Sequence, residues 1–340
     1  EHLVGSGGTY YLIWQSAGQC CGFFRYMMSA TTDGGATWSA PQYVVDYPGT
    51  TTRLAAAASG STLHLNWALT QGGAYSQAYR RITNNGATLG SVQTFVWPDG
   101  GATWQPNVAV AGSDVYLTGG SNATKYVKHS TDDGATFGAP VTLPGTYTGS
   151  MYPHDFVASG ADVYMARWLS VAPTGRLEVL ASHDYGTTWS QPVTMSNAVA
   201  YYQRARLGVT CDGVRLAWLS ALSSEVQLTI AASHDGGATF GPTYWLGGNL
   251  ADFQSMAAFA TSGDRSYVLW KGMRRETTFG GPRDTFFTST SRNTCAPEPT
   301  PTATATPTAT GTSTPTNTAT PTATLAPGGP TNTPTATATP

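Results

Sequence analysis

The chain has 340 residues, of which 11% are charged, and its formal net charge at pH 7 is −2. This sparse and balanced charge excludes the basic surface that nucleic acid or anionic lipid would require, and no apolar run is long enough to span a membrane as a helix. The 39 glycines, 10 tryptophans and 17 tyrosines are typical of an all-β extracellular protein.

Along the chain, each predicted unit has a strand of small residues and then a strand that ends in tryptophan. In chain order the second strand ends at Trp14, Trp67, Gly119, Trp168, Trp218 and Trp270, with Gly119 as the weakened copy. A third strand, such as KYVKHS from Lys125, leads into a recurring turn and a fourth strand. Because no segment has helical periodicity, the pattern predicts four short antiparallel strands per unit.

The recurring turn sets the period of the chain. It reads TTDGGATW from Thr31, ITNNGATL from Ile82, STDDGATF from Ser130, SHDYGTTW from Ser182 and SHDGGATF from Ser233. The third residues of these copies are spaced by 51, 48, 52 and 51 residues. A fixed period near fifty indicates one supersecondary unit copied many times. It predicts a six-bladed β-propeller of four-stranded antiparallel blades over 1–297, with blades at roughly 1–50, 51–103, 104–150, 151–200, 201–250 and 251–297.

The turn Ser-x-Asp-x-Gly-x-Thr-Trp resembles the Asp-box, and residues Glu1 to Asn293 are similar to the sialidase-like (BNR-repeat) propellers. In such a turn the carboxylate can accept hydrogen bonds from its own backbone, and glycine permits a positive φ. The resemblance places the box on the face opposite the ligand funnel. The box residues Asp33, Asp132, Asp184 and Asp235 are therefore predicted to be structural. The stretch from Trp97 to Trp104 is out of register and is predicted to reach the funnel face.

Loops after the second and fourth strands should reach the funnel face, where aromatic residues alternate with Arg and Asp. Such loops suit a polar, ring-shaped ligand such as a sugar acid. Structural packing between blades would use the same residue types, and this alternative stays open. The predicted ligand-binding residues are Arg53, Trp104, Tyr152, Arg204, Arg206, Arg275 and Arg283.

The resemblance leaves two functions open, binding and catalysis, beside a third reading in which the propeller supports a distant domain and binds no ligand. Sialidases clamp the substrate carboxylate with three arginines and use a Tyr nucleophile, a Glu partner and an Asp acid/base. Weak catalytic candidates are Asp46, Tyr202, His154 and Asp155, although adjacent residues such as His154 and Asp155 face opposite sides of a strand. No glutamate falls in the entry loops of blades 4 and 5, and a tyrosine with a pKa of about 10 is a poor nucleophile at pH 7. We therefore expect a propeller that binds a glycan or a surface partner, with an exo-α-sialidase as the alternative.

Cys20, Cys21, Cys211 and Cys295 form an even set, which is compatible with an oxidising compartment. Cys211 and Cys295 fall on the box-bearing face of adjacent predicted blades, so we expect a disulfide between them. The spacing fits no zinc pattern. We expect no cofactor, although Ca²⁺ bound through loop carbonyls would leave no pattern in the sequence.

From Glu298 to Pro340 the chain consists mostly of Thr, Pro and Ala, and Leu325 is its only large apolar residue. Such a segment cannot bury enough apolar surface to offset the entropy of ordering, so 298–340 is predicted to be a disordered linker. The chain opens on Glu1, and its tail pattern still runs at Pro340. We expect further sequence on both sides, a domain or anchor beyond the linker, and an extracellular protein that is secreted or tethered to the cell surface.

Overall fold

The computed structural model describes residues 2–17, 24–45, 54–71, 74–100, 106–121, 124–145, 151–170, 175–199, 205–222, 225–246, 254–272 and 284–290. The chain divides into two units, Glu1–Ala296 and Pro297–Pro340, and every described residue belongs to the first. Strands are the only regular elements among these residues, so this part of the chain has no helix that could cross a membrane.

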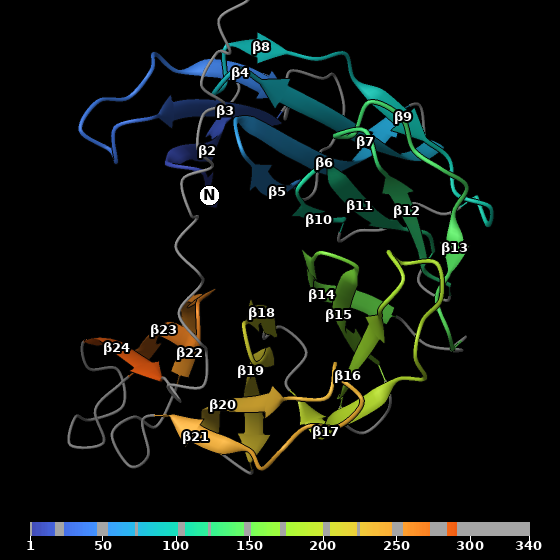
Figure 1. Ribbon diagram of the computed structural model, residues 1–340, viewed down its shortest axis with the longest axis vertical. Coiled ribbons are helices and arrows are strands. Elements are labelled where there is room, and N and C mark those ends of the chain that lie inside the picture. The colour runs from blue at the N-terminus through green and yellow to red at the C-terminus, as the bar shows by residue number, and fades with distance from the viewer. Residues whose placement is uncertain are drawn as a thin grey trace, which may run out of the picture. The chain divides into compact units, whose positions relative to one another are not determined.

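The strands form antiparallel meanders in chain order (Figure 1), which we number sheets 1 to 6. Sheet 1 comprises β1 (His2–Ser6), β2 (Thr9–Ala17), β3 (Phe24–Thr31) and β4 (Gln42–Val45). Sheet 2 comprises β5 (Leu54–Ser59), β6 (Thr62–Gln71), β7 (Ala74–Thr83), β8 (Thr88–Leu89) and β9 (Gln93–Phe95), with β8 and β9 both paired to β7. Sheet 3 comprises β10 (Asn107–Ala111), β11 (Asp114–Gly119), β12 (Tyr126–Ser130) and β13 (Val141–Thr142).

The next two meanders are joined by one residue pair, Val199 with Ser220. Sheet 4 comprises β14 (Met151–Ser159), β15 (Asp162–Leu169), β16 (Gly175–Ser182) and β17 (Val193–Val199). Sheet 5 comprises β18 (Arg206–Thr210), β19 (Gly213–Leu222), β20 (Glu225–Ser233) and β21 (Tyr244–Leu246). The described part of sheet 6 has β22 (Gln254–Ser262), β23 (Arg265–Gly272) and β24 (Asp284–Thr290).

The first strands of consecutive sheets lie side by side. β1 contacts β5, β5 contacts β10, β10 contacts β14, β14 contacts β18, and β18 contacts β22. Each sheet therefore runs from an inner strand to an outer one, and neighbouring sheets pack face to face. This arrangement is a β-propeller. The count of six complete blades stays a prediction, because sheet 6 has three described strands.

Hydrophobic clusters fill the spaces between consecutive sheets. Between sheets 1 and 2, for example, Tyr11, Ile13 and Met28 pack with Leu63 and Leu65, and all five are fully buried. Side chains alternate between the two faces of a strand, so each sheet contributes one face to the cluster before it and the other face to the cluster after it. This explains why the strands are rich in apolar residues at consecutive positions.

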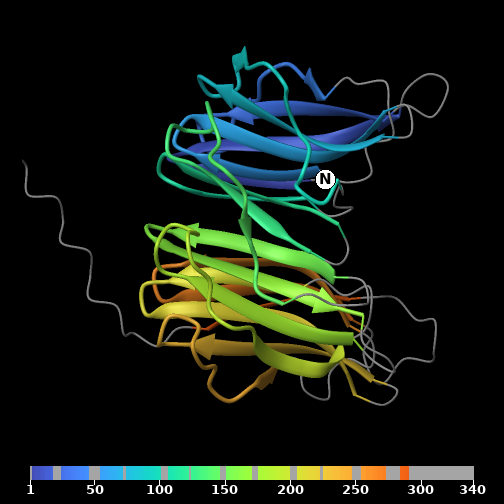
Figure 2. The ribbon, with the colours of Figure 1, turned by 90° about the vertical axis from the view of Figure 1, so that its right-hand side faces the viewer.

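An antiparallel meander puts its first and third connections at one end and its second connection at the other. We call the end with the first and third connections the turn end. It carries the aspartate turns, which are Thr31–Trp38, Ser130–Phe137, Ser182–Trp189 and Ser233–Phe240, and the related turn Ile82–Leu89. The side view in Figure 2 shows hairpin turns of successive sheets gathered along one edge. We call the opposite end of the sheets the loop end.

The weakened third copy of the tryptophan strand has a packing explanation. A Cβ on Gly119 would lie 1.8 Å from Cε2 of Trp97. Trp97 is buried, stacks on Tyr126 at 6.0 Å between ring centroids, and donates its Nε1–H to Oε1 of Gln77 at 2.8 Å. A tryptophan from the preceding connection thus fills the space of the missing side chain. Trp97 belongs to the core and not, as the sequence predicted, to an exposed ligand loop.

Candidate functional site

A hollow of about 390 Å³ lies among the inner strands β1, β5, β10, β14 and β18. Five strands converge here, and the alanines of 55–58 with Ala109 and Ala158 line the walls. Larger side chains at these positions would fill the space. The volume falls at the small end of the roughly 300–1,000 Å³ range of ligand pockets. The radial arrangement of blades therefore leaves a central hollow of ligand size.

Asp155 on β14 and Arg206 on β18 both line this hollow, from two different sheets. Nη1 of Arg206 lies 3.8 Å from Oδ1 of Asp155, and Oδ2 of Asp155 accepts the backbone N–H of Leu207 at 2.7 Å. The Arg206 side chain is 36% exposed and that of Asp155 is 18% exposed. The carboxylate is held in place by the backbone, while the guanidinium can still reach a ligand. Together the pair offers hydrogen-bond acceptors for hydroxyls and donors for a carboxylate.

A β-bulge in β14 lies directly before Asp155. The pairing of β14 with β15 shifts between Pro153 and Asp155, which leaves His154 as the extra residue. Bulges re-aim side chains and are common beside functional sites. The simple alternation expected for His154 and Asp155 is therefore broken here, and the His154 side chain lies outside the described part. Tyr152, on the same strand, packs against Trp168 at a centroid distance of 5.8 Å.

Of the predicted site residues, the structure thus brings Asp155 and Arg206 together and places Tyr152 in the packing between sheets 4 and 5. The remaining ones lie outside the described residues. They are Asp46, Arg53, Trp104, Tyr202, Arg204, Arg275 and Arg283. Cys295 also lies outside them, so its disulfide with Cys211 stays a prediction.

A buried polar network near the loop end of sheets 2 and 3 was not foreseen from the sequence. Nε2 of Gln77 donates to Oδ1 of Asn66 at 2.7 Å and to the carbonyl of Thr118 at 2.8 Å, and Nδ2 of Asn66 donates to the carbonyl of Asn107 at 2.8 Å. The sequence feature that could have indicated this network is the presence of the amide residues Asn66 and Gln77 within apolar strands. Their saturated hydrogen bonds identify them as structural.

Lys125 is a second buried polar group at the loop end of sheet 3. Its ammonium donates to the carbonyls of Gly120, at 3.4 Å, and Ser121. Burial lowers the pKa of Lys125 to about 7, and the charge of Asp99 opposes this shift. Asp99 itself accepts the Ser121 N–H at 2.9 Å. This lysine is bound by carbonyls of its own connection, and its pKa lies near neutral pH.

Glu178 is engaged in a buried ion pair. Its Oε2 accepts Nε and Nη2 of Arg167 at 3.0 and 2.8 Å, and Arg176 approaches Oε1 at 2.8 Å. Arg167 is fully buried and also donates to the carbonyl of Pro144 at 2.8 Å. Glu178 is therefore occupied by two arginines.

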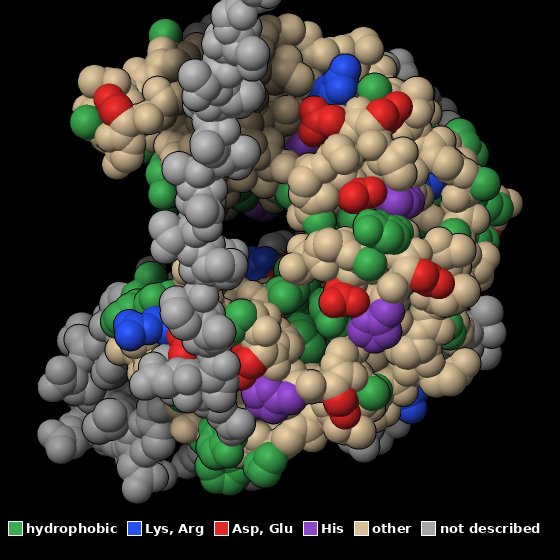
Figure 3. Space-filling model, viewed as in Figure 1, with side chains coloured by type: hydrophobic (Ala, Val, Ile, Leu, Met, Phe, Trp, Pro, Cys, Tyr) green, Lys and Arg blue, Asp and Glu red, His purple; other side chains and the backbone are tan. Residues whose placement is uncertain are grey.

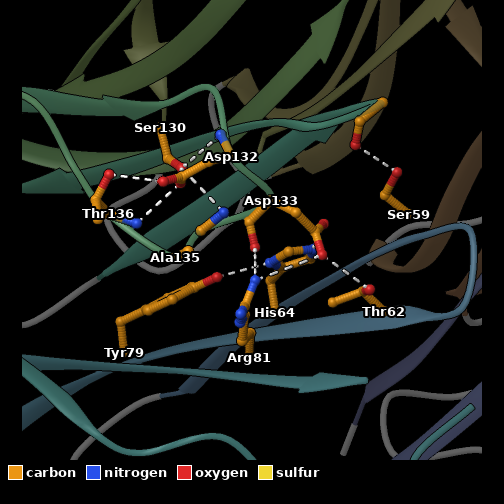
Figure 4. Close-up of polar contacts among 12 residues, drawn as sticks. Ser59, Thr62, His64, Tyr79, Arg81, Ser130, Asp132, Asp133, Ala135 and Thr136 are labelled. Atoms are coloured by element: carbon orange, nitrogen blue, oxygen red, sulfur yellow. Dashed lines mark hydrogen bonds and ion pairs between the residues drawn. The ribbon is translucent and has the colours of Figure 1, made fainter. Parts of the chain in front are cut away.

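The aspartate turns share one hydrogen-bonding pattern, which Asp132 illustrates (Figure 4). Its Oδ1 accepts the Thr136 N–H at 2.8 Å and the Ser130 hydroxyl at 2.7 Å, and its Oδ2 accepts the Thr136 hydroxyl at 2.7 Å. These bonds, with that of the Thr136 backbone the largest cause, lower the pKa of Asp132 to about 2. Equivalent bonds surround Asp33, Asp184 and Asp235. Each carboxylate is saturated by its own turn and is not directed at the central hollow.

The residue after each of these aspartates, or after Asn84 in sheet 2, has a positive φ. We call it the clasp position, and it is occupied by Gly34, Asn85, Asp133, Tyr185 and Gly236, with φ between 54° and 73°. Asn85 accepts the Thr9 hydroxyl at 2.9 Å, and Asp133 accepts that of Thr62 at 3.1 Å and lies 3.4 Å from His64 Nε2 (Figure 4). These turns therefore join neighbouring sheets.

Within the described residues, no group of three or more His, Cys, Asp or Glu side chains is placed to hold a metal ion. No family model matches the sequence, and no curated protein matches it. Several solved structures are similar to this chain in fold. The chain is similar to a mutant of the NanB sialidase from Streptococcus pneumoniae, with a TM-score of 0.53, 9% identity, and coverage of 79% of this chain and 64% of that one. It is also similar to an ulvan lyase, with a TM-score of 0.54, 12% identity, and coverage of 78% and 73%.

At these identities the likeness supports the propeller fold and nothing finer. The chain spans slightly less than two thirds of the sialidase structure, since 64% of that chain is covered. The two similar proteins are a sialidase and a polysaccharide lyase.

Proposed function

We propose that this chain is a sialidase-like Asp-box propeller that binds a glycan, with a sugar acid as the expected ligand, at the central hollow. One observation carries the proposal: Asp155 and Arg206, from separate sheets, line a hollow of about 390 Å³ between the inner strands. Arg206 would pair with the ligand carboxylate, and Asp155 would accept hydrogen bonds from ring hydroxyls. The fold shared with a sialidase and a polysaccharide lyase supports a carbohydrate ligand.

The alternative function is that of an exo-α-sialidase with Tyr202 as nucleophile and Asp46 as acid/base. Binding is favoured because Glu178, the glutamate whose side chain is described, is held by Arg167 and Arg176. A tyrosine without a carboxylate partner stays protonated at neutral pH and attacks slowly. The low charge and the Thr/Pro-rich 298–340 segment support a secreted or surface-tethered protein, with a further domain or anchor beyond the linker.

The test is to titrate the full chain with 3′-sialyllactose by calorimetry and to assay release of 4-methylumbelliferone from its sialoside. We expect binding without turnover, and we expect Arg206→Gln to weaken binding by at least roughly tenfold, as for the loss of one charge-assisted pair. Asp155→Asn keeps an acceptor for the Leu207 N–H and should weaken binding less. Turnover that is lost in Tyr202→Phe would establish the sialidase instead. Unchanged binding by Arg206→Gln would contradict the placement of the site.

A further inference from the structure

A second hollow lies at the turn end, between the aspartate turns of sheets 3 and 4. It has a volume of about 460 Å³, and its described lining includes His129, Phe137 and Tyr185 with the hydroxyl-bearing residues Thr131, Thr136 and Thr187. It shares no lining residue with the central hollow. Aromatic rings beside a set of hydroxyl groups form a surface with both stacking and hydrogen-bonding capacity.

His129 and Tyr185 of this lining belong to a stack of three nearly parallel rings. Tyr116, fully buried, stacks on His129 at 4.5 Å with an interplanar angle of 7°, and His129 stacks on Tyr185 at 6.1 Å with an angle of 9°. Oδ1 of Asp114 lies 2.7 Å from Nε2 of His129 and fixes the middle ring. Tyr185, the outer ring, remains 46% exposed. Figure 3 shows histidine side chains beside acidic ones on the visible face. The stack of rings therefore ends in a solvent-accessible tyrosine.

Tyr185 occupies a position where the backbone disfavours it. Its φ is +59°, and the same position holds Gly34 and Gly236 in two other aspartate turns. A bulky residue in the left-handed region is uncommon and costs about 1 kcal/mol or more. At Asn85 and Asp133 the clasp residue makes hydrogen bonds to the preceding sheet. Tyr185 instead contributes a ring that stacks on His129 of the preceding sheet, and the residue as a whole is 46% exposed.

We infer that Tyr185 is the platform of a second carbohydrate site, distinct from the central hollow, that takes a neutral oligosaccharide of all-equatorial pyranose units. Such a sugar presents axial C–H groups on both faces of its ring, and these pack on an aromatic plane. Its equatorial hydroxyls point sideways, toward Thr131, Thr136 and Thr187. The described lining of this hollow holds no Lys, Arg, Asp or Glu, which favours a neutral sugar over a sugar acid.

The experiment titrates the full chain with cellotetraose by calorimetry. We expect wild type to bind, Tyr185→Trp to bind within about threefold of it, and Tyr185→Gly to bind roughly tenfold more weakly. Glycine is native to this position in two turns, so Tyr185→Gly should unfold within a few degrees of wild type. Tyr244→Ala, which removes a tyrosine that is 52% exposed on β21, is the matched control and should bind like wild type.

The result separates this site from the central one. Arg206→Gln should keep its affinity for cellotetraose, and Tyr185→Gly should keep its affinity for 3′-sialyllactose. If wild type fails to bind cellotetraose, or if Tyr185→Gly binds it equally well, Tyr185 is only a clasp between sheets and the inference is overturned. Loss of cellotetraose binding in Arg206→Gln with full binding in Tyr185→Gly would assign this sugar to the central hollow and also overturn it.

Discussion

At the scale of single residues, the aspartate turns make stability depend on pH in the acid range. Hydrogen bonds from their own turns lower the pKa values of Asp132 and Asp235 to about 2. A carboxyl whose folded pKa lies below its unfolded value stabilises the fold above the unfolded pKa, and this contribution is lost as pH falls through the folded pKa. We expect the urea concentration at the unfolding midpoint to decrease as the pH is lowered from about 4 to about 2. The double variant Asp132→Asn/Asp235→Asn should show a smaller fall, and an identical pH profile would refute the assignment.

Lys125 makes the opposite end of the sheets sensitive to pH in the alkaline range. Burial lowers its pKa to about 7, whereas an unfolded lysine titrates near about 10.4. Between these values the unfolded chain binds a proton that the folded chain does not, so stability rises with pH. We expect wild type to gain stability relative to Lys125→Met from pH 7 to pH 10, as measured by urea unfolding of both proteins. A pH-independent difference between them would contradict the lowered pKa.

At the scale of elements, the glycine two positions after the aspartate can provide room for the preceding sheet. A Cβ on Gly134 would lie 1.8 Å from the hydroxyl of Tyr79, in sheet 2. Gly35 is the equivalent residue of sheet 1, and its nearest neighbours, in Trp38 of its own turn, lie 3.9 Å away. Both glycines have a positive φ, of 76° and 95°.

This pair gives a matched test of the contact between sheets. We expect Gly35→Ala to cost about 1 kcal/mol, from backbone strain alone. Gly134→Ala should cost about 3 kcal/mol, because overpacking against Tyr79 is added to the same strain. Urea unfolding measures both values. Equal losses would mean that the aspartate turn does not act on its neighbour.

The elements that the sequence predicted correctly are those with a repeated local cause. The second strands that carry Trp67 and Trp168, and the turns between third and fourth strands, follow from alternation and from Asp-x-Gly turn chemistry, both of which are local. The strand end predicted at Trp67 was wrong, because β6 continues to Gln71. The weak third copy at Gly119 has a non-local cause, because the missing side chain is replaced by Trp97 from the connection between β9 and β10. The same applies to the bulge at His154, which depends on the pairing of β14 with β15 and has no marker in the sequence.

The candidate site was predicted only in part, for the same reason. Asp155 and Arg206 are 51 positions apart in the sequence, and the repeat predicts that such positions meet on neighbouring inner strands. The stack of Tyr116, His129 and Tyr185 combines side chains of two sheets at three different strand or turn positions. No period in the sequence relates those positions, so the second hollow depends on how the two sheets pack and could not be predicted from the sequence.

At the scale of the whole molecule, Pro297–Pro340 forms a unit separate from Glu1–Ala296. Its composition offers almost no apolar side chain for a core, so it should contribute little to the stability of the propeller. We expect a chain ending at Ala296 to unfold at the same urea midpoint and with the same slope as the 340-residue chain. A lower midpoint for the shortened chain would show that the segment packs on the propeller.

Sheet 1 carries an exposed apolar face, whereas the equivalent faces of sheets 2, 3 and 5 are buried against the sheets before them. Leu12 is 38% exposed, whereas Leu65, Leu117 and Leu216 at the same strand position are fully buried against a preceding sheet. Tyr10, Trp38 and Tyr43 lie on sheet 1 and its turn and are also more than 40% exposed, and Phe287 on sheet 6 is 65% exposed. In a six-bladed propeller, sheet 6 would cover this face of sheet 1.

Closure of the ring can be tested with two exposed apolar residues. If sheet 6 packs on sheet 1, Leu12→Asp places a charge in an interface and should cost about 3 kcal/mol or more. Val96, in the connection after β9, is 73% exposed and is the control. Val96→Asp should stay within about 0.5 kcal/mol of wild type. Urea unfolding of both variants decides the matter, because equally small effects would mean that sheet 1 keeps an open face and that sheet 6 does not close the ring.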